Sequence, residues 1–67
     1  MFVADRFYDR IHAVDLTTGI PEQHWDIPDT PAQIAYDRVR QRLFIRLYYA
    51  DEIAVLDVTD GSYTLMF

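Results

Sequence analysis

Short segments rich in apolar and aromatic residues follow one another along the whole chain, separated by clusters of Asp, Thr, Gly and Pro. Segments of about five to seven residues bounded by such turn-forming residues are typical of β-strands. No segment has the spacing of an amphipathic helix. The pattern predicts an all-β fold with strands at residues 1–7, 10–16, 22–27, 32–36, 42–48, 52–58 and 62–67.

The residues between the segments support these boundaries. In the turn at residues 15–19, Asp15 can accept backbone N–H groups, and Gly19 can adopt a positive φ at low cost. The same combination recurs at residues 57–61. A further turn is predicted at residues 37–41.

The chain repeats itself at a spacing of 42 residues, and no gap is needed to align the two copies. The identical pairs are Phe2 with Phe44, Asp9 with Asp51, Ile11 with Ile53, Asp15 with Asp57, Thr17 with Thr59 and Gly19 with Gly61. The similar pairs are Val3 with Ile45, Val14 with Leu56, Leu16 with Val58 and Trp25 with Phe67. Repeats of about 40 to 45 residues with four strands each are typical of β-propeller blades.

Three segments carry a more specific resemblance. They are Thr30-Pro31-Ala32-Gln33-Ile34-Ala35-Tyr36-Asp37, then Arg42-Leu43-Phe44-Ile45, and then Ile53-Ala54-Val55-Leu56-Asp57 with its turn to Gly61. These segments resemble the YVTN-type β-propeller repeat, and residues 2–5 with residues 11–19 are similar to its second half. The resemblance implies antiparallel four-stranded blades in which strands a, b, c and d run outward from the axis of the ring.

In that topology residues 32–36 form an innermost a strand, whereas residues 1–7 form a b strand with no a strand before it. The resemblance therefore implies a partial blade at residues 1–27 (strands b, c, d), followed by a complete blade at residues 28–67 (strands a, b, c, d). Such an incomplete ring implies further propeller blades or other copies of the chain as partners. Because an uncovered strand edge seeks a partner, we expect that the isolated chain is not a well-folded monomer.

Charge and composition narrow the range of partners. The net charge is −5, from eleven acidic residues against six arginines, and the acidic residues are spread along the chain. Phosphate contacts need a concentrated basic surface, so nucleic acid is not an expected partner. No apolar run is long enough to span a membrane, and the chain has no cysteine for a disulfide. The sequence does not indicate a cellular compartment.

The predicted loops between strands b and c are unusually rich in aromatic and arginine side chains. Because Arg and Tyr are enriched at binding hot spots, we expect a protein or small-molecule ligand on this loop face. The candidate ligand-binding residues are Arg6, Tyr8, Asp9, Asp29, Arg46, Tyr48 and Asp51. The alternative is that the aromatic residues pack between neighbouring blades. If the strand continues through Tyr48 and Tyr49, their side chains point to opposite faces, and at least one of them is then buried.

The motifs give no reason to expect a metal ion, a cofactor or a catalytic group. His12 and His24 have no second ligand at a metal-like spacing, and we expect partly buried or rim positions for them. Loop carboxylates such as Asp9 and Asp51 suit Ca²⁺, but two loops supply too few ligands. Neither glycine lies in a phosphate-binding loop, and Ser62 has no nucleophile-elbow motif around it.

The sequence thus predicts a structural and binding scaffold. The alternative is a fragment or subunit of a propeller enzyme, similar to quinoprotein amine dehydrogenases or sugar lactonases, whose active site is completed by other blades. The chain alone is not expected to be catalytic, and the enzyme alternative stays open because its discriminating residues would lie in those other blades.

Overall fold

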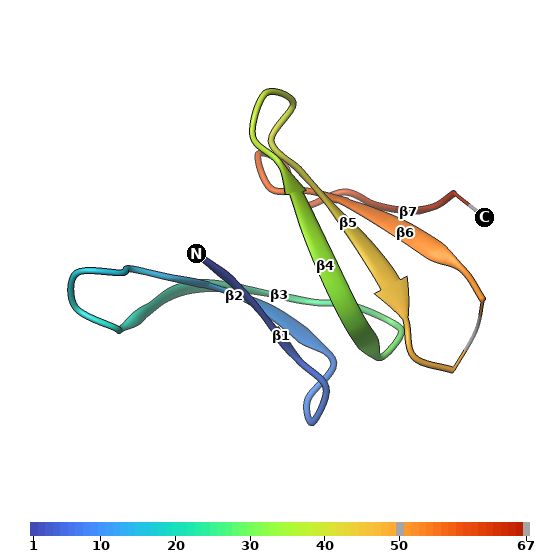
Figure 1. The fold of residues 1–67 in the computed structure, drawn as a ribbon, viewed down its shortest axis with the longest axis horizontal. Coiled ribbons are helices and arrows are strands. Elements are labelled where there is room, and N and C mark those ends of the chain that lie inside the picture. The colour runs from blue at the N-terminus through green and yellow to red at the C-terminus, as the bar shows by residue number, and fades with distance from the viewer. Residues whose placement is uncertain (50, 67) are drawn as a thin grey trace.

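The computed structural model describes residues 1–49 and 51–66, which form seven strands and no helix (Figure 1). The strands are β1 (Phe2–Asp5), β2 (Arg10–Val14), β3 (Pro21–Asp26), β4 (Pro31–Asp37), β5 (Arg42–Leu47), β6 (Ile53–Asp57) and β7 (Tyr63–Leu65). The predicted all-β fold is therefore confirmed, although strands such as β1 and β5 end earlier than predicted. Within the described residues no helix is long and apolar enough to cross a membrane.

The strands form two antiparallel sheets, and within each sheet every strand pairs with the next one in sequence. The first sheet has the order β1-β2-β3, and the second has the order β4-β5-β6-β7. Residues 27–30 join the two sheets. The sheets lie side by side at an angle, and β1 of the first contacts β4 of the second (Figure 1).

The sequence repeat is also a repeat of strand pairing. Phe2 pairs with Ala13 across β1 and β2, and Phe44 pairs with Val55 at the equivalent position across β5 and β6. The neighbouring pairs follow the same register in both sheets. Equivalent residues of the two sheets therefore occupy equivalent backbone positions.

The two Asp-to-Gly turns have the same hydrogen bonds. Gly19 donates its N–H to the Asp15 carbonyl (2.7 Å), and Gly61 donates its N–H to the Asp57 carbonyl (2.8 Å). Each aspartate carboxylate also accepts the N–H two residues further on, at 2.7 and 2.9 Å. The glycines have φ of 72° and 78°, a region that other residues rarely adopt. The capping role predicted for both aspartates is confirmed.

The two sheets differ in the register of their last strand pair. The pairing of β2 with β3 contains a β-bulge, whereas that of β6 with β7 has no shift of register over its described pairs. As a result Trp25 pairs with Ile11, but Met66 donates its N–H to the Ile53 carbonyl (2.8 Å). The predicted correspondence of Trp25 with Phe67 is therefore shifted by one residue to Met66, and Phe67 itself lies outside the described residues.

Two other hairpin turns share a second hydrogen-bond pattern. The Asp5 carboxylate accepts the N–H groups of residues 7 and 8 (2.9 and 3.2 Å), and the Asp37 carboxylate accepts those of residues 39 and 40 (3.1 and 3.3 Å). Asp9 and Gln41 close these turns, each with φ of 54°, a region uncommon for residues other than glycine. The predicted turn at residues 37–41 is thus confirmed, with Gln41 in the left-handed position.

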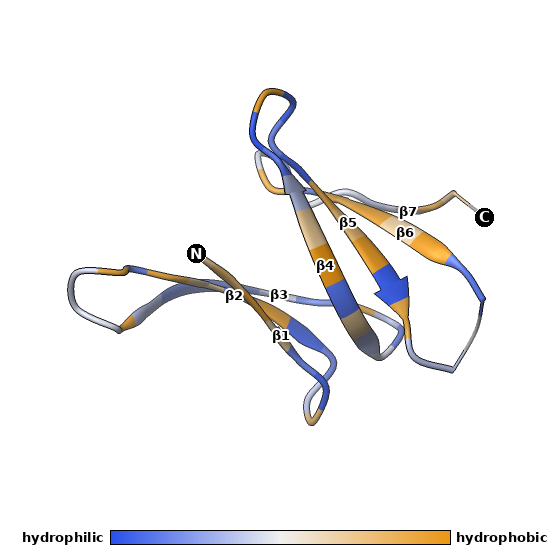
Figure 2. Ribbon diagram, in the orientation of Figure 1, coloured by the Kyte–Doolittle hydropathy of each residue, from blue (hydrophilic) through white to orange (hydrophobic). Residues whose placement is uncertain are grey.

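The hydrophobic core lies between the two sheets. The fully or nearly fully buried side chains are Ile11 of the first sheet, Leu43, Ile45, Leu47, Ala54 and Leu56 of the second, and Ile27 and Pro31 beside the connection. Phe2 and Trp25 of the first sheet pack against this cluster. The centroid of the Phe2 ring lies 4.7 Å from that of the Tyr36 ring in the second sheet. In Figure 2 hydrophobic residues, coloured orange, lie along β6 and in the middle of β5.

The two sheets bury opposite faces of the repeat. Ile45 is fully buried, but its equivalent Val3 is 38% exposed. Conversely, Ile11 is fully buried, but its equivalent Ile53 is 37% exposed. The buried face of the first sheet therefore packs against the non-equivalent face of the second. This head-to-tail packing leaves one outer face on each sheet.

Candidate functional site

Three connections lie at the same end of the two sheets (Figure 1). They are residues 6–9 between β1 and β2, residues 27–30 between β3 and β4, and residues 48–52 between β5 and β6, of which residue 50 is outside the described part. We name this end of the molecule the loop end. It contains most of the predicted ligand-binding residues.

Hydrogen bonds hold the three loops together. Ile27 donates its N–H to the Asp9 carbonyl (2.9 Å), and Tyr48 donates its N–H to the Thr30 carbonyl (2.8 Å). The Thr30 hydroxyl donates to the Asp9 carboxylate, with 2.8 Å between Oγ1 and Oδ1. Asp9 thus uses both its carbonyl and its carboxylate to position the loops.

Asp29 is held in a similar way. Its carboxylate accepts a hydrogen bond from the Tyr63 hydroxyl (3.1 Å), and the Tyr63 ring packs against the core from β7. Burial, followed by the hydrogen bond to Asp29, raises the pKa of the Tyr63 hydroxyl far above its ordinary value. Through this hydrogen bond Tyr63 links β7 to the loop end.

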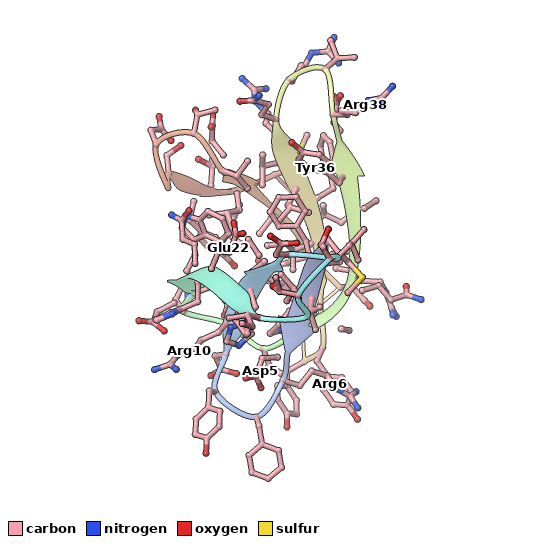
Figure 3. All side chains as sticks on the ribbon, turned by 90° about the vertical axis from the view of Figure 1, so that its left-hand side faces the viewer. Asp5, Arg6, Arg10, Glu22, Tyr36 and Arg38 are labelled. Carbon is pink, nitrogen blue, oxygen red and sulfur yellow. The ribbon has the colours of Figure 1, made fainter. Side chains whose placement is uncertain are left out.

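A shallow groove of about 280 Å³ opens at the loop end, lined by Arg6, Phe7, Thr30, Tyr48 and Tyr49. The guanidinium carbon of Arg6 lies 5.2 Å from the centre of the Tyr48 ring, within the range of a cation–π interaction. Figure 3 shows the Arg6 side chain at this end of the molecule. The structure therefore brings together Arg6 and Tyr48, two of the predicted ligand-binding residues.

The tyrosines of the third loop are both exposed, Tyr48 at 54% and Tyr49 at 84%. The strand predicted to carry them ends at Leu47, so its alternation between two faces does not extend to them. Their rings instead meet edge to face, with centroids 4.8 Å apart. The expected burial of one of them, which required a continuing strand, does not occur within this chain.

The other predicted residues lie outside the groove. The Tyr8 ring faces the guanidinium group of Arg10 (5.6 Å). Arg46 still belongs to β5, so the pleat of the strand directs it to the outer face of the second sheet, beside a separate hollow of about 430 Å³. Asp51 is an exposed residue of the third loop. The predicted loop-face site is therefore not one cluster.

The structure also pairs two histidines whose proximity the sequence does not reveal. His12 of β2 stands opposite His24 of β3, with ring centroids 5.9 Å apart. Next to the β2–β3 turn, Val14 pairs with Pro21. A regular ladder continued from this pair would place Gln23 opposite His12. The β-bulge shifts the register by one residue, so His24 lies opposite His12 instead. Within the described residues no three His, Asp or Glu side chains are arranged to hold a metal ion.

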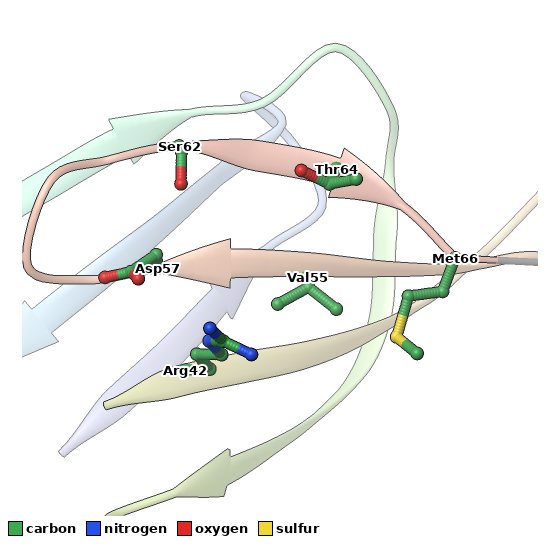
Figure 4. Close-up of a pocket in the computed structure, with 6 residues that line it drawn as sticks. All are labelled: Arg42, Val55, Asp57, Ser62, Thr64 and Met66. Atoms are coloured by element: carbon green, nitrogen blue, oxygen red, sulfur yellow. The ribbon is translucent and has the colours of Figure 1, made fainter. Parts of the chain in front are cut away.

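A further hollow of about 300 Å³ lies on the outer face of the second sheet (Figure 4). Its lining residues are Arg42, Val55, Asp57, Ser62, Thr64 and Met66. Arg42 pairs with Asp57 across β5 and β6. The hollow is lined by these two charged side chains and by the apolar side chains of Val55 and Met66. It belongs to the sheet face rather than to the loop end.

Four aspartates that begin turns have pKa values below that of an ordinary carboxyl group. They are Asp5, Asp15, Asp37 and Asp57. The largest cause is a hydrogen bond each time: with His12 for Asp5, with the Thr17 N–H for Asp15, with Arg40 for Asp37 and with the Thr59 hydroxyl for Asp57. These hydrogen bonds favour the ionised form of each carboxylate.

This arrangement predicts loss of stability in acid. Because folding lowers the pKa values, their contribution is complete above the unfolded value of about 3.9 and is lost as the pH falls through the lower folded values. We expect the urea midpoint to decrease below about pH 4. Asp15→Asn and Asp57→Asn keep an accepting oxygen but cannot titrate, so each is expected to make this decrease shallower. A decrease identical to that of the unmodified chain in both variants would contradict the assignment.

Comparison with known proteins found no match for the chain among protein-family models, curated proteins or solved structures. The fold and the site by themselves define an all-β protein of two antiparallel sheets, with an arginine–tyrosine groove at its loop end.

Proposed function

We propose that the chain is a β-propeller-type repeat segment, of the YVTN kind, that acts as a structural and binding scaffold. The observation that carries the proposal is the head-to-tail packing of two sheets that repeat each other in sequence. An interface between a face and the non-equivalent face of the next unit can continue, and it either closes into a ring or forms a filament. A β-propeller is the ring case, built from four-stranded sheets around a central channel.

The outer face of the second sheet is the surface on which the packing continues. By the repeat it is equivalent to the buried face of the first sheet, since Phe44 corresponds to Phe2 and Ile53 corresponds to Ile11. The hollows of about 300 and 430 Å³ both lie on this face. In the proposed scaffold a further blade, or another copy of the chain, covers it.

The loop end is the proposed binding surface. Loops positioned by a rigid scaffold are common sites of binding. Arg6 and Tyr48 contact a protein or small-molecule ligand in the groove, while Asp9 and Asp29 hold the loops in place. The division of roles follows from the contacts of these four side chains.

The scaffold is tested by analytical ultracentrifugation of the chain at increasing concentration. We expect discrete oligomers, because in the isolated chain only another copy can cover the outer face. Val55→Glu, on that face, is expected to shift the mass towards the monomer, and Val39→Glu, at the exposed β4–β5 turn, is expected to leave it unchanged. Circular dichroism establishes that both variants are folded. A cooperatively unfolding monomer at every concentration would count against the scaffold.

The loop-end groove is tested by an NMR screen with a library of small fragments. We expect the backbone signals of residues 6–8, 30 and 48–49 to shift more than those of the β2–β3 turn. Binding is expected to weaken in Arg6→Ala and to persist in Arg38→Ala, an exposed arginine at the other end of the molecule (Figure 3). Fragments that bind both variants equally would show that the groove is not the ligand site.

A further inference from the structure

The outer face of the first sheet is polar, in contrast to that of the second. Its side chains, placed by the register of β1, β2 and β3, are Val3, Asp5, Arg10, His12, His24 and Asp26. The Arg10 guanidinium is paired with the Asp26 carboxylate (2.7 Å), so its positive charge is balanced locally. The two histidines of the chain therefore lie together on a face that carries little net positive charge.

The geometry of the two histidines suits a shared ion. Residues directly opposite each other on antiparallel strands project to the same face, with Cβ atoms about 4.5 to 5.5 Å apart. Here the two ring centroids are 5.9 Å apart and the rings are tilted by 51°. Two imidazole nitrogens that each lie about 2.1 Å from one metal ion require ring centres roughly 5 to 6 Å apart. The observed separation falls in that range.

Asp5 orients one of the two rings. Its Oδ2 lies 3.1 Å from Nε2 of His12, and its Oδ1 accepts the N–H groups of Phe7 and Tyr8 (2.9 and 3.2 Å). The turn therefore fixes the carboxylate, and the carboxylate in turn fixes the imidazole. With Nε2 directed at Asp5, Nδ1 of His12 is the nitrogen left for an ion. A carboxylate bonded to the outer nitrogen of a metal-binding histidine is a recurrent arrangement that raises the basicity of the ligand.

We propose that His12 and His24 bind a divalent transition-metal ion of the Zn²⁺ class, with Asp5 as the outer partner of His12. Imidazole nitrogen suits Zn²⁺, Ni²⁺ and Cu²⁺, whereas Ca²⁺ and Mg²⁺ prefer oxygen ligands. Among the described residues no third side chain completes the site, so the protein supplies two ligands and water fills the remaining positions. The ion links β2 to β3 across the bulge.

The site needs only residues of the first sheet, so it is argued from other observations than the proposed scaffold. A head-to-tail assembly would place this face against the outer face of a second sheet, so the site is tested at a concentration at which the chain is a monomer. His24 is exposed and His12 is half-buried with 22% of its side chain accessible, so an ion reaches both rings from solvent. Because an ion that binds only the folded state stabilises it by mass action, added Zn²⁺ is expected to raise the thermal midpoint.

The test is calorimetric titration of the chain with Zn²⁺, together with NMR of the imidazole nitrogens. We expect one ion per chain and simultaneous shifts of both histidine rings. His12→Gln and His24→Gln are each expected to weaken the affinity at least tenfold, and Asp5→Asn is expected to weaken it roughly tenfold, the usual effect of an outer-shell change. Mg²⁺ is expected to produce neither heat nor ring shifts.

Two results would overturn the proposal. In the first, Zn²⁺ shifts only one histidine ring, or none, in the unmodified chain. In the second, His24→Gln, folded by circular dichroism, binds Zn²⁺ within twofold of the unmodified affinity. The ring shifts are measured on the unmodified chain, so the proposal is decided even if a variant fails to fold.

Discussion

Ile45→Ala is expected to lower the free energy of unfolding by about 2 to 5 kcal/mol, whereas Val3→Ala, at the equivalent position of the repeat, is expected to cost less than about 1 kcal/mol. The reason is the head-to-tail packing, which buries Ile45 completely and leaves Val3 38% exposed. Truncation of a buried aliphatic side chain loses transfer free energy and leaves a cavity. Urea unfolding followed by the fluorescence of Trp25 measures both changes.

The opposite face supplies the matched control. Ile11→Ala is expected to cost about 2 to 5 kcal/mol, and its repeat equivalent, Ile53→Ala, much less, because Ile53 is 37% exposed. Equal costs within both pairs, measured at a concentration at which the chain is a monomer, would contradict head-to-tail packing. A chain of this size has little stability to lose, so Ile45→Val, with an expected cost of about 0.5 to 1.5 kcal/mol, keeps the comparison measurable if the alanine variant is unfolded.

Trp25→Ala is expected to destabilise the fold by about 3 kcal/mol, at the lower end of the range for large aromatic side chains. The indole lies between the two sheets, 6.1 Å from the Phe2 ring and 3.6 Å from the position of a Cβ on Gly61. It therefore fills the space between β3 and the β6–β7 turn. Because the variant lacks the fluorophore, thermal unfolding followed by circular dichroism is the appropriate measurement.

Phe7→Ala is the control for this loss of an aromatic ring. Phe7 is 92% exposed at the loop end, and its removal is expected to change stability by less than about 0.5 kcal/mol. A similar loss in both variants would mean that Phe7 is buried in an assembly of chains. A negligible loss for Trp25→Ala would mean that the two sheets do not pack through the indole.

The turns and the strands were predictable because they depend on residues close together in sequence. Asp15 and Gly19 define one turn, and Asp57 and Gly61 repeat it, since each pair needs only its own backbone to form the hydrogen bonds observed. The turn that ends at Gln41 was also found. The places where β1 and β5 end were missed, because the apolar and aromatic residues that follow them resemble the strands themselves.

The candidate site was predicted only in part. Arg6 and Tyr48 do meet in the groove, because equivalent loops of repeated hairpins lie at the same end. Arg46 was assigned to the loop face although the predicted strand at residues 42–48 already included it, and in the structure the pleat of β5 directs it to the outer face of the second sheet. The pairing of His12 with His24 was missed because it depends on a bulge. The local signal was Pro21, which pairs next to the bulge and has no N–H to donate, and the sequence prediction did not use it.

The sequence by itself determined the all-β class, the turns and the repeated register, because local backbone preferences and alternation of side chains suffice for them. Only the tertiary structure decided how the two sheets meet. Ile11 and Ile53 are the same residue at equivalent positions, yet Ile11 is fully buried and Ile53 is 37% exposed. The contact between β1 and β4, which are far apart in the chain, places the face of Ile11 against the face of Ile45 and leaves the face of Ile53 outside.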